Sequence, residues 1–169
     1  MIVRSVVRLL DTLVERVGRI VCWLVVPLTV LVTFEVVSRY VFNNPHIWGM
    51  HVFTWIMGTH FLLLGGYALL HQRHIRMDVL YTRWSKKRRT VSDVVGHFLF
   101  FIPFVGATIW ATAVAAGRSW DTHEVTMSMT PLPVYVYKTV IPIGLLLLLI
   151  AGIAEIAKGI WYLVRGEEL

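Results

Sequence analysis

Four long apolar runs, at about residues 20–42, 48–70, 91–116 and 134–163, limit what this chain can fold into. Each run exceeds the roughly 20 residues that a helix needs to cross about 30 Å of hydrocarbon. The runs are too long for membrane strands and lack the alternation of period two that such strands show. Because a backbone in lipid must satisfy its own polar groups, helices are expected. With 57% hydrophobic residues, the chain is predicted to be an all-α membrane protein with four transmembrane helices in a single membrane domain, residues 1–169.

The lysines and arginines are concentrated in two segments, and this distribution predicts the orientation. Loops with an excess of Lys and Arg stay on the cytoplasmic side of a membrane. The loop at 43–47 has no basic residue, and the loop between the last two runs has only Arg118. Both termini and the loop at 71–90 are therefore expected in the cytoplasm, and nucleic acid is not an expected partner. The basic residues are Arg4, Arg8, Arg16 and Arg19 in the N-terminal segment and Arg73, Arg76, Arg83, Lys86, Lys87, Arg88 and Arg89 in the loop.

The first 18 residues have the pattern of an amphipathic helix that lies along the membrane surface. Apolar residues at 2, 3, 6, 7, 10, 13, 14 and 17 follow helical spacing, and charged residues occupy the other face. Such a helix rests its apolar face at the boundary between headgroups and acyl chains. The interleaved charges leave no continuous apolar core for a cleaved signal peptide. We therefore predict an N-terminal amphipathic interfacial helix over 1–18 that leads into the first span.

Glu35 and Arg39 are charged residues inside the first apolar run, near its outer end. Their four-residue spacing places them on one helix face, where they can form an ion pair. Charged side chains inside a span are expensive, so a function is the first hypothesis for them. Arg39 can, however, extend its side chain toward the membrane surface. We interpret the two residues as a structural pair at an interhelical or subunit contact rather than as part of an ion pathway.

Histidines in or near the spans raise the alternative of a haem site. His60 and His71 are eleven residues apart and share a helix face, while His71 and His97 both fall near the predicted cytoplasmic side. A haem needs two such nitrogens aimed across a gap of cofactor size. His71 lies in a polar turn and His60 has no mid-membrane partner, so hydrogen-bonded or interfacial histidines are the preferred interpretation. His51 is interpreted as a polar residue at a helix–helix or subunit contact.

The remaining polar residues predict no enzyme, no metal site and no cofactor in this chain. Asp121, His123 and Glu124 are potential metal ligands in one short loop, but no distant residues complete a metal site around them. No serine, cysteine or carboxylate pair has the neighbours that nucleophilic or acid–base catalysis requires.

A stripe of small residues in the third run predicts close helix packing. Side chains four residues apart lie on one helix face, and small ones let two backbones approach closely. The stripe consists of Ala107, Ala111 and Ala115.

A series of short motifs follows along nearly the whole chain. They are Glu35-Val-Val-Ser-Arg39-Tyr-Val-Phe-Asn43, then Trp48, Gly65-Gly66-Tyr67-Ala68-Leu69, His74-Ile-Arg-Met-Asp78-Val-Leu-Tyr81, Pro131-Leu132-Pro133 and Ile141-Pro142-Ile143-Gly144. In this order they resemble the small membrane subunit, the Q-type protein, of tripartite ATP-independent periplasmic (TRAP) transporters. One departure is His51, because many relatives carry an acidic residue soon after the tryptophan.

The resemblance implies a supporting role in solute uptake across the bacterial inner membrane. In such systems a periplasmic binding protein captures a substrate, commonly an organic acid, and a large membrane subunit moves it inward with a sodium gradient. The small subunit packs on the scaffold of the large one and stabilises it, so the substrate and sodium sites are expected in the large subunit. The residues predicted at the subunit interface or in structural pairs are Glu35, Arg39, Trp48, His51 and Asp78.

Two other functions remain open on the sequence. The first is a haem-binding membrane anchor or cytochrome that uses His71 and His97, which a Soret band in the purified protein would favour. The second is a self-assembling exporter with four spans, which would form a homo-oligomer and transport without a partner.

Overall fold

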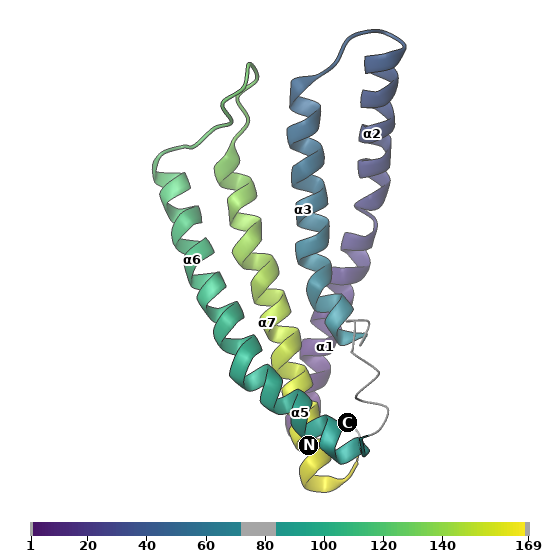
Figure 1. Cartoon of the computed structure of the whole chain (residues 1–169), viewed down its shortest axis with the longest axis vertical. Coiled ribbons are helices and arrows are strands. Elements are labelled where there is room, and N and C mark those ends of the chain that lie inside the picture. Colours follow the sequence, from purple (N-terminus) through teal and green to yellow (C-terminus); the bar gives the residue numbers. More distant parts are fainter. Residues whose placement is uncertain (1, 72–83, 168–169) are drawn as a thin grey trace.

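The computed structural model describes residues 2–71 and 84–167, with side chains from residue 4 onward. Within these residues, four helical stretches are long and apolar enough to cross a membrane: Arg4–Tyr40, Ile47–Leu70, Lys86–Asp121 and Val134–Arg165. The predicted all-α architecture with four such helices is confirmed (Figure 1). The elements are α1 (Ile2–Cys22), α2 (Val25–Tyr40), α3 (Ile47–Leu70), α5 (Lys86–Gly96), the π-helical turn η1 (His97–Phe101), α6 (Ile102–Asp121) and α7 (Val134–Arg165).

The N-terminal stretch forms two helices separated by a short break. Helix α1 extends beyond residue 18 to Cys22, and a turn at Trp23 and Leu24 separates it from α2. Pro27 explains the break, because it has no N–H and its ring crowds the carbonyl of Trp23 four residues earlier. The structure thus has the predicted N-terminal helix, and its position in the membrane interface stays a prediction.

One flank of α1 packs on the rest of the chain. Val7, Val14 and Val21 are buried at seven-residue intervals, and Val14 belongs to a small core with residues of α3 and α7. An ion pair adds to this contact, since Nζ of Lys158 in α7 lies 3.0 Å from Oδ1 of Asp11. Helix α1 is therefore attached to the bundle by apolar packing and by charge.

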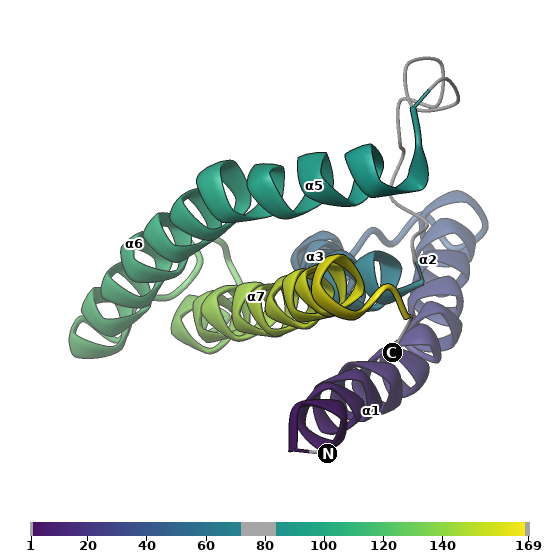
Figure 2. The same ribbon diagram turned by 90° about the horizontal axis from the view of Figure 1, so that it is seen from below.

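The third long helix runs from Lys86 to Asp121 and changes direction midway (Figure 2). Helix α5 passes through the π-helical turn η1 into α6, whose second residue is Pro103. Because Pro103 has no N–H to donate to the carbonyl four residues earlier, a local π-turn is the expected adjustment. The helix is longer than the predicted span 91–116, since polar residues at both ends continue it beyond its apolar part.

Helices α3 and α7 lie side by side at the centre, α6 lies along α7, and α2 lies at the margin against α3 (Figure 1). Two glycines let the central backbones approach closely. A Cβ added to Gly66 would lie 3.0 Å from the carbonyl oxygen of Leu147, and one added to Gly144 would lie 3.0 Å from Cβ of Leu62. Small residues at a helix crossing permit this kind of contact in membranes.

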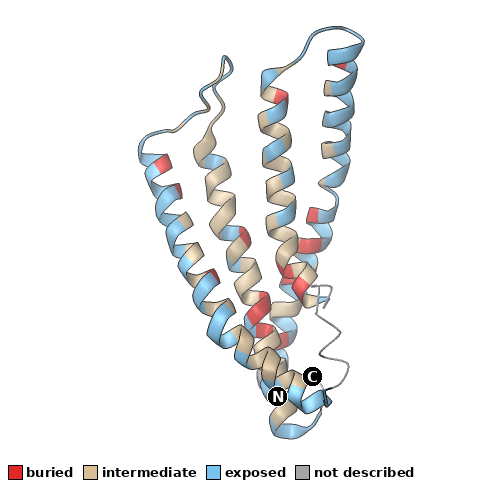
Figure 3. Ribbon diagram, viewed as in Figure 1, coloured by how far each residue is buried: buried red, intermediate tan, exposed pale blue. Residues whose placement is uncertain are grey.

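Few of the described residues of the bundle are buried (Figure 3). Many large apolar side chains are exposed along α2 and α6. Such a surface suits lipid or a membrane partner, because it needs no polar covering there. The two termini and the start of α5 lie at one end of the bundle, and the loops at 41–46 and 122–133 lie at the other (Figure 1).

Candidate functional site

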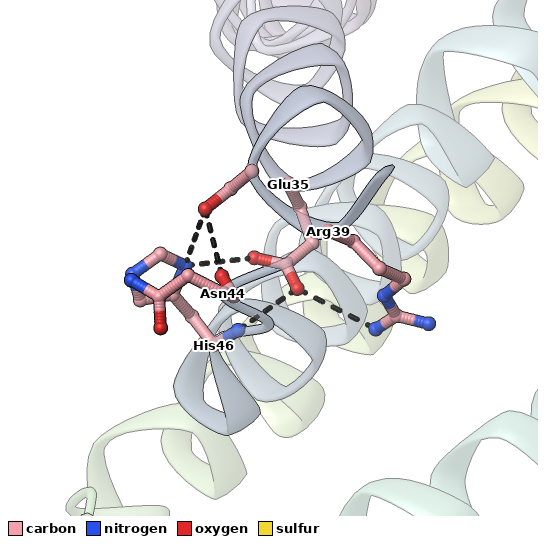
Figure 4. A network of polar contacts seen from close by, with 5 residues as sticks. Glu35, Arg39, Asn44 and His46 are labelled. Atoms are coloured by element: carbon pink, nitrogen blue, oxygen red, sulfur yellow. Dashed lines mark hydrogen bonds and ion pairs between the residues drawn. The ribbon is translucent and has the colours of Figure 1, made fainter. Parts of the chain in front are cut away.

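The carboxylate of Glu35 connects the end of α2 to the start of α3. Its Oε1 accepts a hydrogen bond from the backbone N–H of His46 at 3.0 Å and lies 3.4 Å from Nη2 of Arg39 (Figure 4). Its Oε2 lies 3.4 Å from Nδ1 of the His46 ring. The Glu35 side chain is only 16% exposed, whereas that of Arg39 is 47% exposed. The loop residue His46 is therefore the closer partner of the carboxylate, and Arg39 joins it from the more exposed side.

Ser38, which is buried, folds the loop at 41–46 back onto α2. Its hydroxyl donates a hydrogen bond to the carbonyl of Asn44 at 2.7 Å, and its own carbonyl accepts one from the Asn44 N–H at 3.0 Å. Asn43 has a left-handed backbone with φ of 52°, which asparagine adopts more readily than most residues. These contacts bring His46 back toward Glu35.

Gly49 leaves room for the carboxylate beside α3. A Cβ at Gly49 would lie 3.1 Å from Oε2 of Glu35, closer than an ordinary contact. The ring of His46 stacks on Phe34 at 5.5 Å between centroids and meets Trp48 at 5.6 Å. Trp48, predicted at the interface or in a structural position, thus lies beside the Glu35 contacts.

A mostly apolar cleft with a volume of about 300 Å³ opens between α2 and α3 next to this network. The ion pair of Glu35 and Arg39 contributes to its lining. Polar side chains inside a span generally face protein or a cavity rather than lipid. The cleft is lined by Leu31, Val32, Glu35, Val36, Arg39, Tyr40, Gly49, Met50 and Phe53.

His51, which was also predicted at the interface, lies apart from this network. His51 is half-buried and follows Gly49 by two residues, which places it on the opposite side of α3 from the Glu35 contact. Asp78 lies outside the described residues. The roles of His51 and Asp78 in an interface stay predictions.

The stripe of alanines on α6 is exposed rather than packed within the chain. Helix α6 turns a different face toward its neighbours, with Val105, Ala116 and Ser119 buried. The stripe therefore does not pack against another described helix of this chain, and its role in close helix packing stays a prediction. The exposed residues are Ala107, Ala111 and Ala115.

Each histidine considered for haem has a ring nitrogen within hydrogen-bond distance of a backbone carbonyl. Nδ1 of His60 lies 3.1 Å from the carbonyl oxygen of Val21, next to the break between α1 and α2. These contacts support the interpretation that the histidines are hydrogen-bonded. That the chain binds no cofactor stays a prediction. The other pairs are His71 with the Tyr67 carbonyl at 3.0 Å and His97 with the Asp93 carbonyl at 2.8 Å.

Glu124 orders the loop between α6 and α7. Its carboxylate pairs with Nζ of Lys138 and accepts a hydrogen bond from the buried hydroxyl of Ser119 at 2.6 Å. The hydrogen bond from Lys138, followed by that from Ser119, holds the pKa of Glu124 below its ordinary value. Asp121 and His123 are exposed in the same loop. The structure thus gives Glu124 a structural role that the sequence interpretation of this loop did not include.

Sequence reasoning identified Glu35 but missed His46, Ser38 and Gly49. The Asn43-Asn44-Pro45 motif indicates the end of a helix, yet no local pattern shows that the loop returns to Glu35. Gly49, in the first turn of an apolar helix, was the available signal that another group lies close to the backbone of α3 there.

The network and the cleft lie inside a segment that matches a known family. Residues 28–160 match the model for tripartite ATP-independent periplasmic transporters, DctQ component, and this segment is well over half of the chain. A comparison with curated proteins finds no match. The family match confirms the resemblance found in the sequence motifs. The chain belongs to the DctQ family and is the small membrane component of a tripartite ATP-independent periplasmic transporter.

Proposed function

We propose that this chain packs on the scaffold of the large membrane subunit of a sodium-driven TRAP transporter and stabilises it in the bacterial inner membrane. A periplasmic binding protein delivers the substrate, which is an organic acid. Membership of the DctQ family and four helices able to span a membrane support this role. The sodium gradient and the substrate class follow from the resemblance to TRAP transporters.

The cleft between α2 and α3 is the observation that supports a contact with the large subunit. Helix α2 packs mainly on α3 and leaves many apolar side chains exposed. An ion pair at the edge of such a surface is costly in contact with lipid, because hydrocarbon offers it no hydrogen bonds. An apolar helix of the large subunit in the cleft would cover both the apolar lining and the pair of Glu35 and Arg39.

The charge distribution supports an orientation with both termini in the cytoplasm. The two termini and the basic start of α5 share one end of the bundle (Figure 1). Because basic loops stay on the cytoplasmic side, this end is the proposed cytoplasmic end. The loop at 122–133 then faces the periplasm, from which the substrate arrives.

A pair of adjacent valines tests the proposed contact. Val36 lines the cleft and is 49% exposed, whereas Val37 is 41% exposed on another side of α2 and does not line it. Val36→Trp fills the cleft and is expected to lower co-purification of the co-expressed large membrane subunit severalfold. Val37→Trp adds the same bulk toward lipid and should keep wild-type recovery. Wild-type recovery with Val36→Trp, or a loss only with Val37→Trp, would place the contact elsewhere.

Reconstitution tests the role in transport. Liposomes that contain both membrane subunits should take up substrate when the binding protein and an inward sodium gradient are supplied. Omission of this chain should abolish most of that uptake, because the scaffold loses its support. Full uptake by the large subunit alone would contradict the proposed function.

A further inference from the structure

An open groove runs along one face of α5, at the basic end of the bundle. Its volume is about 660 Å³. The lining residues recur at helical spacing, so the groove follows the helix axis. They are Trp84, Lys87, Arg88, Val91, Ser92 and Val95.

The groove faces away from the rest of the bundle. Thr90 and Val94, on another face of α5, are the residues nearest to Gly159 of α7. In the view along the bundle, α5 lies beside α7, and no other described helix lies on its outer side (Figure 2). Val91 and Val95 in the groove are 43% and 53% exposed. Among the described residues, nothing therefore covers this side of α5.

Two cations in the groove have no partner within the part of the chain that the structure describes. Lys87 and Arg88 form no ion pair or hydrogen bond there through their side chains. Their neighbour Arg89 differs, because its Nε donates a hydrogen bond to the carbonyl of Trp84 at 3.0 Å. The groove therefore presents two cationic groups that can bind an anion.

The order of residue types along the groove matches the order of groups in a phospholipid. The cations lie at its first turn, Ser92 in the middle and Val95 toward the membrane. Lys87 and Val95 are separated by about 12 Å along the axis at 1.5 Å per residue. The exposed apolar surface continues beyond the groove with Phe98 and Leu99, which are 68% and 59% exposed. A free phosphate would use only the basic end, whereas a lipid would use the whole length.

We propose that this groove is a binding site for an anionic phospholipid. The phosphate binds Lys87 and Arg88, the Ser92 hydroxyl donates to the glycerol ester region, and the first part of an acyl chain lies on Val91 and Val95. The net negative charge of the lipid offsets part of the charge of the two cations, whereas a zwitterionic headgroup brings a cation of its own and has no net charge to offset them. This inference does not depend on the proposed transporter function.

The test compares lipid binding by the purified full chain and two charge-matched variants. The double variant Lys87→Gln/Arg88→Gln removes the groove cations. The control Arg8→Gln/Arg16→Gln removes two exposed charges from α1, for which no side-chain partner is present among the described residues. Native mass spectrometry measures retained phosphatidylglycerol and phosphatidylcholine, and thermal unfolding measures stabilisation by each lipid. A basic residue near an anionic surface strengthens binding about fivefold, so removal of both should weaken phosphatidylglycerol binding about 25-fold.

The expected result is a preference of the wild type for phosphatidylglycerol over phosphatidylcholine that the groove variant loses and the control retains. An equal loss in the control would overturn the proposal, since the attraction would then be a property of the whole basic surface. A third arm adds inorganic phosphate at millimolar concentration. If phosphate alone reproduces the full thermal stabilisation, the site binds a free anion and the lipid assignment is wrong.

Discussion

Substitution of Gly66 by alanine measures how closely α3 and α7 pack. The added Cβ would lie 3.0 Å from the carbonyl oxygen and 3.3 Å from the carbonyl carbon of Leu147. These are backbone atoms, so relief requires a shift of the whole helix α7. Overpacking of this kind costs about 1–3 kcal/mol. The higher helix propensity of alanine offsets up to about 1 kcal/mol. With the full propensity gain subtracted, we expect Gly66→Ala to destabilise the chain by up to about 2 kcal/mol.

Gly106 in α6 provides the matched control, because a Cβ there would meet nothing within 4 Å. Gly106→Ala has the propensity gain without the clash, so it should leave stability unchanged or raise it by up to about 1 kcal/mol. For a chain of this size, 1 kcal/mol shifts Tm by about 2–4 °C. Thermal unfolding of the purified chain in one detergent, followed by circular dichroism, should show Tm lowered by up to about 8 °C for Gly66→Ala and not lowered for Gly106→Ala.

The sign of the difference between the two variants decides the outcome. Equal Tm values would show that the backbones of α3 and α7 are not in direct contact at Gly66. A lower Tm for Gly106→Ala alone would show that α6 packs through a face other than the one described.

Three further predictions concern the loops and the candidate site. Glu35→Ala should lower the fraction of monodisperse protein in size-exclusion chromatography more than Glu35→Gln, because glutamine still accepts the hydrogen bond from the His46 N–H; equal losses would contradict this. The pKa of Glu124 lies below its ordinary value of 4.5, so its contribution to stability is present above that pH and lost as the pH falls through the lowered value. The Tm of the wild type should therefore fall more steeply below pH 4.5 than that of Glu124→Gln, and parallel curves would refute the role of its charge. In intact cells with the native cysteine replaced, a membrane-impermeant reagent should label a cysteine at Thr130 and not one at Ser85, and the opposite pattern would invert the topology.

Much of the fold followed from local sequence patterns. The predicted spans 48–70 and 134–163 nearly coincide with α3 and α7, which cover Ile47–Leu70 and Val134–Arg165. The agreement has a physical cause, since a backbone in hydrocarbon must form helix wherever the sequence is apolar for long enough. The family motifs were likewise readable along the chain, and the match over residues 28–160 confirms the family that they indicate.

Helix ends and bends were less predictable. The third helix covers Lys86–Asp121 rather than 91–116, because hydropathy marks the apolar part of a helix and not the polar turns that continue it. Pro27 and Pro103 are both visible in the sequence, and each removes a backbone N–H from its helix. Whether the helix then breaks, as it does near Pro27, or forms a π-turn, as it does before Pro103, depends on how the chain relaxes around the missing N–H.

Only the tertiary structure decided which partners the functional residues meet. The four-residue spacing of Glu35 and Arg39 predicts their pairing, but the contact of Glu35 with His46 depends on a loop that returns to α2. The alanine stripe has the right spacing for packing, yet α6 turns another face toward α7. Spacing determines which residues share a face of one helix, because helical geometry is local. Which face meets a neighbour depends on how all the helices pack together, so it becomes known only from the assembled bundle.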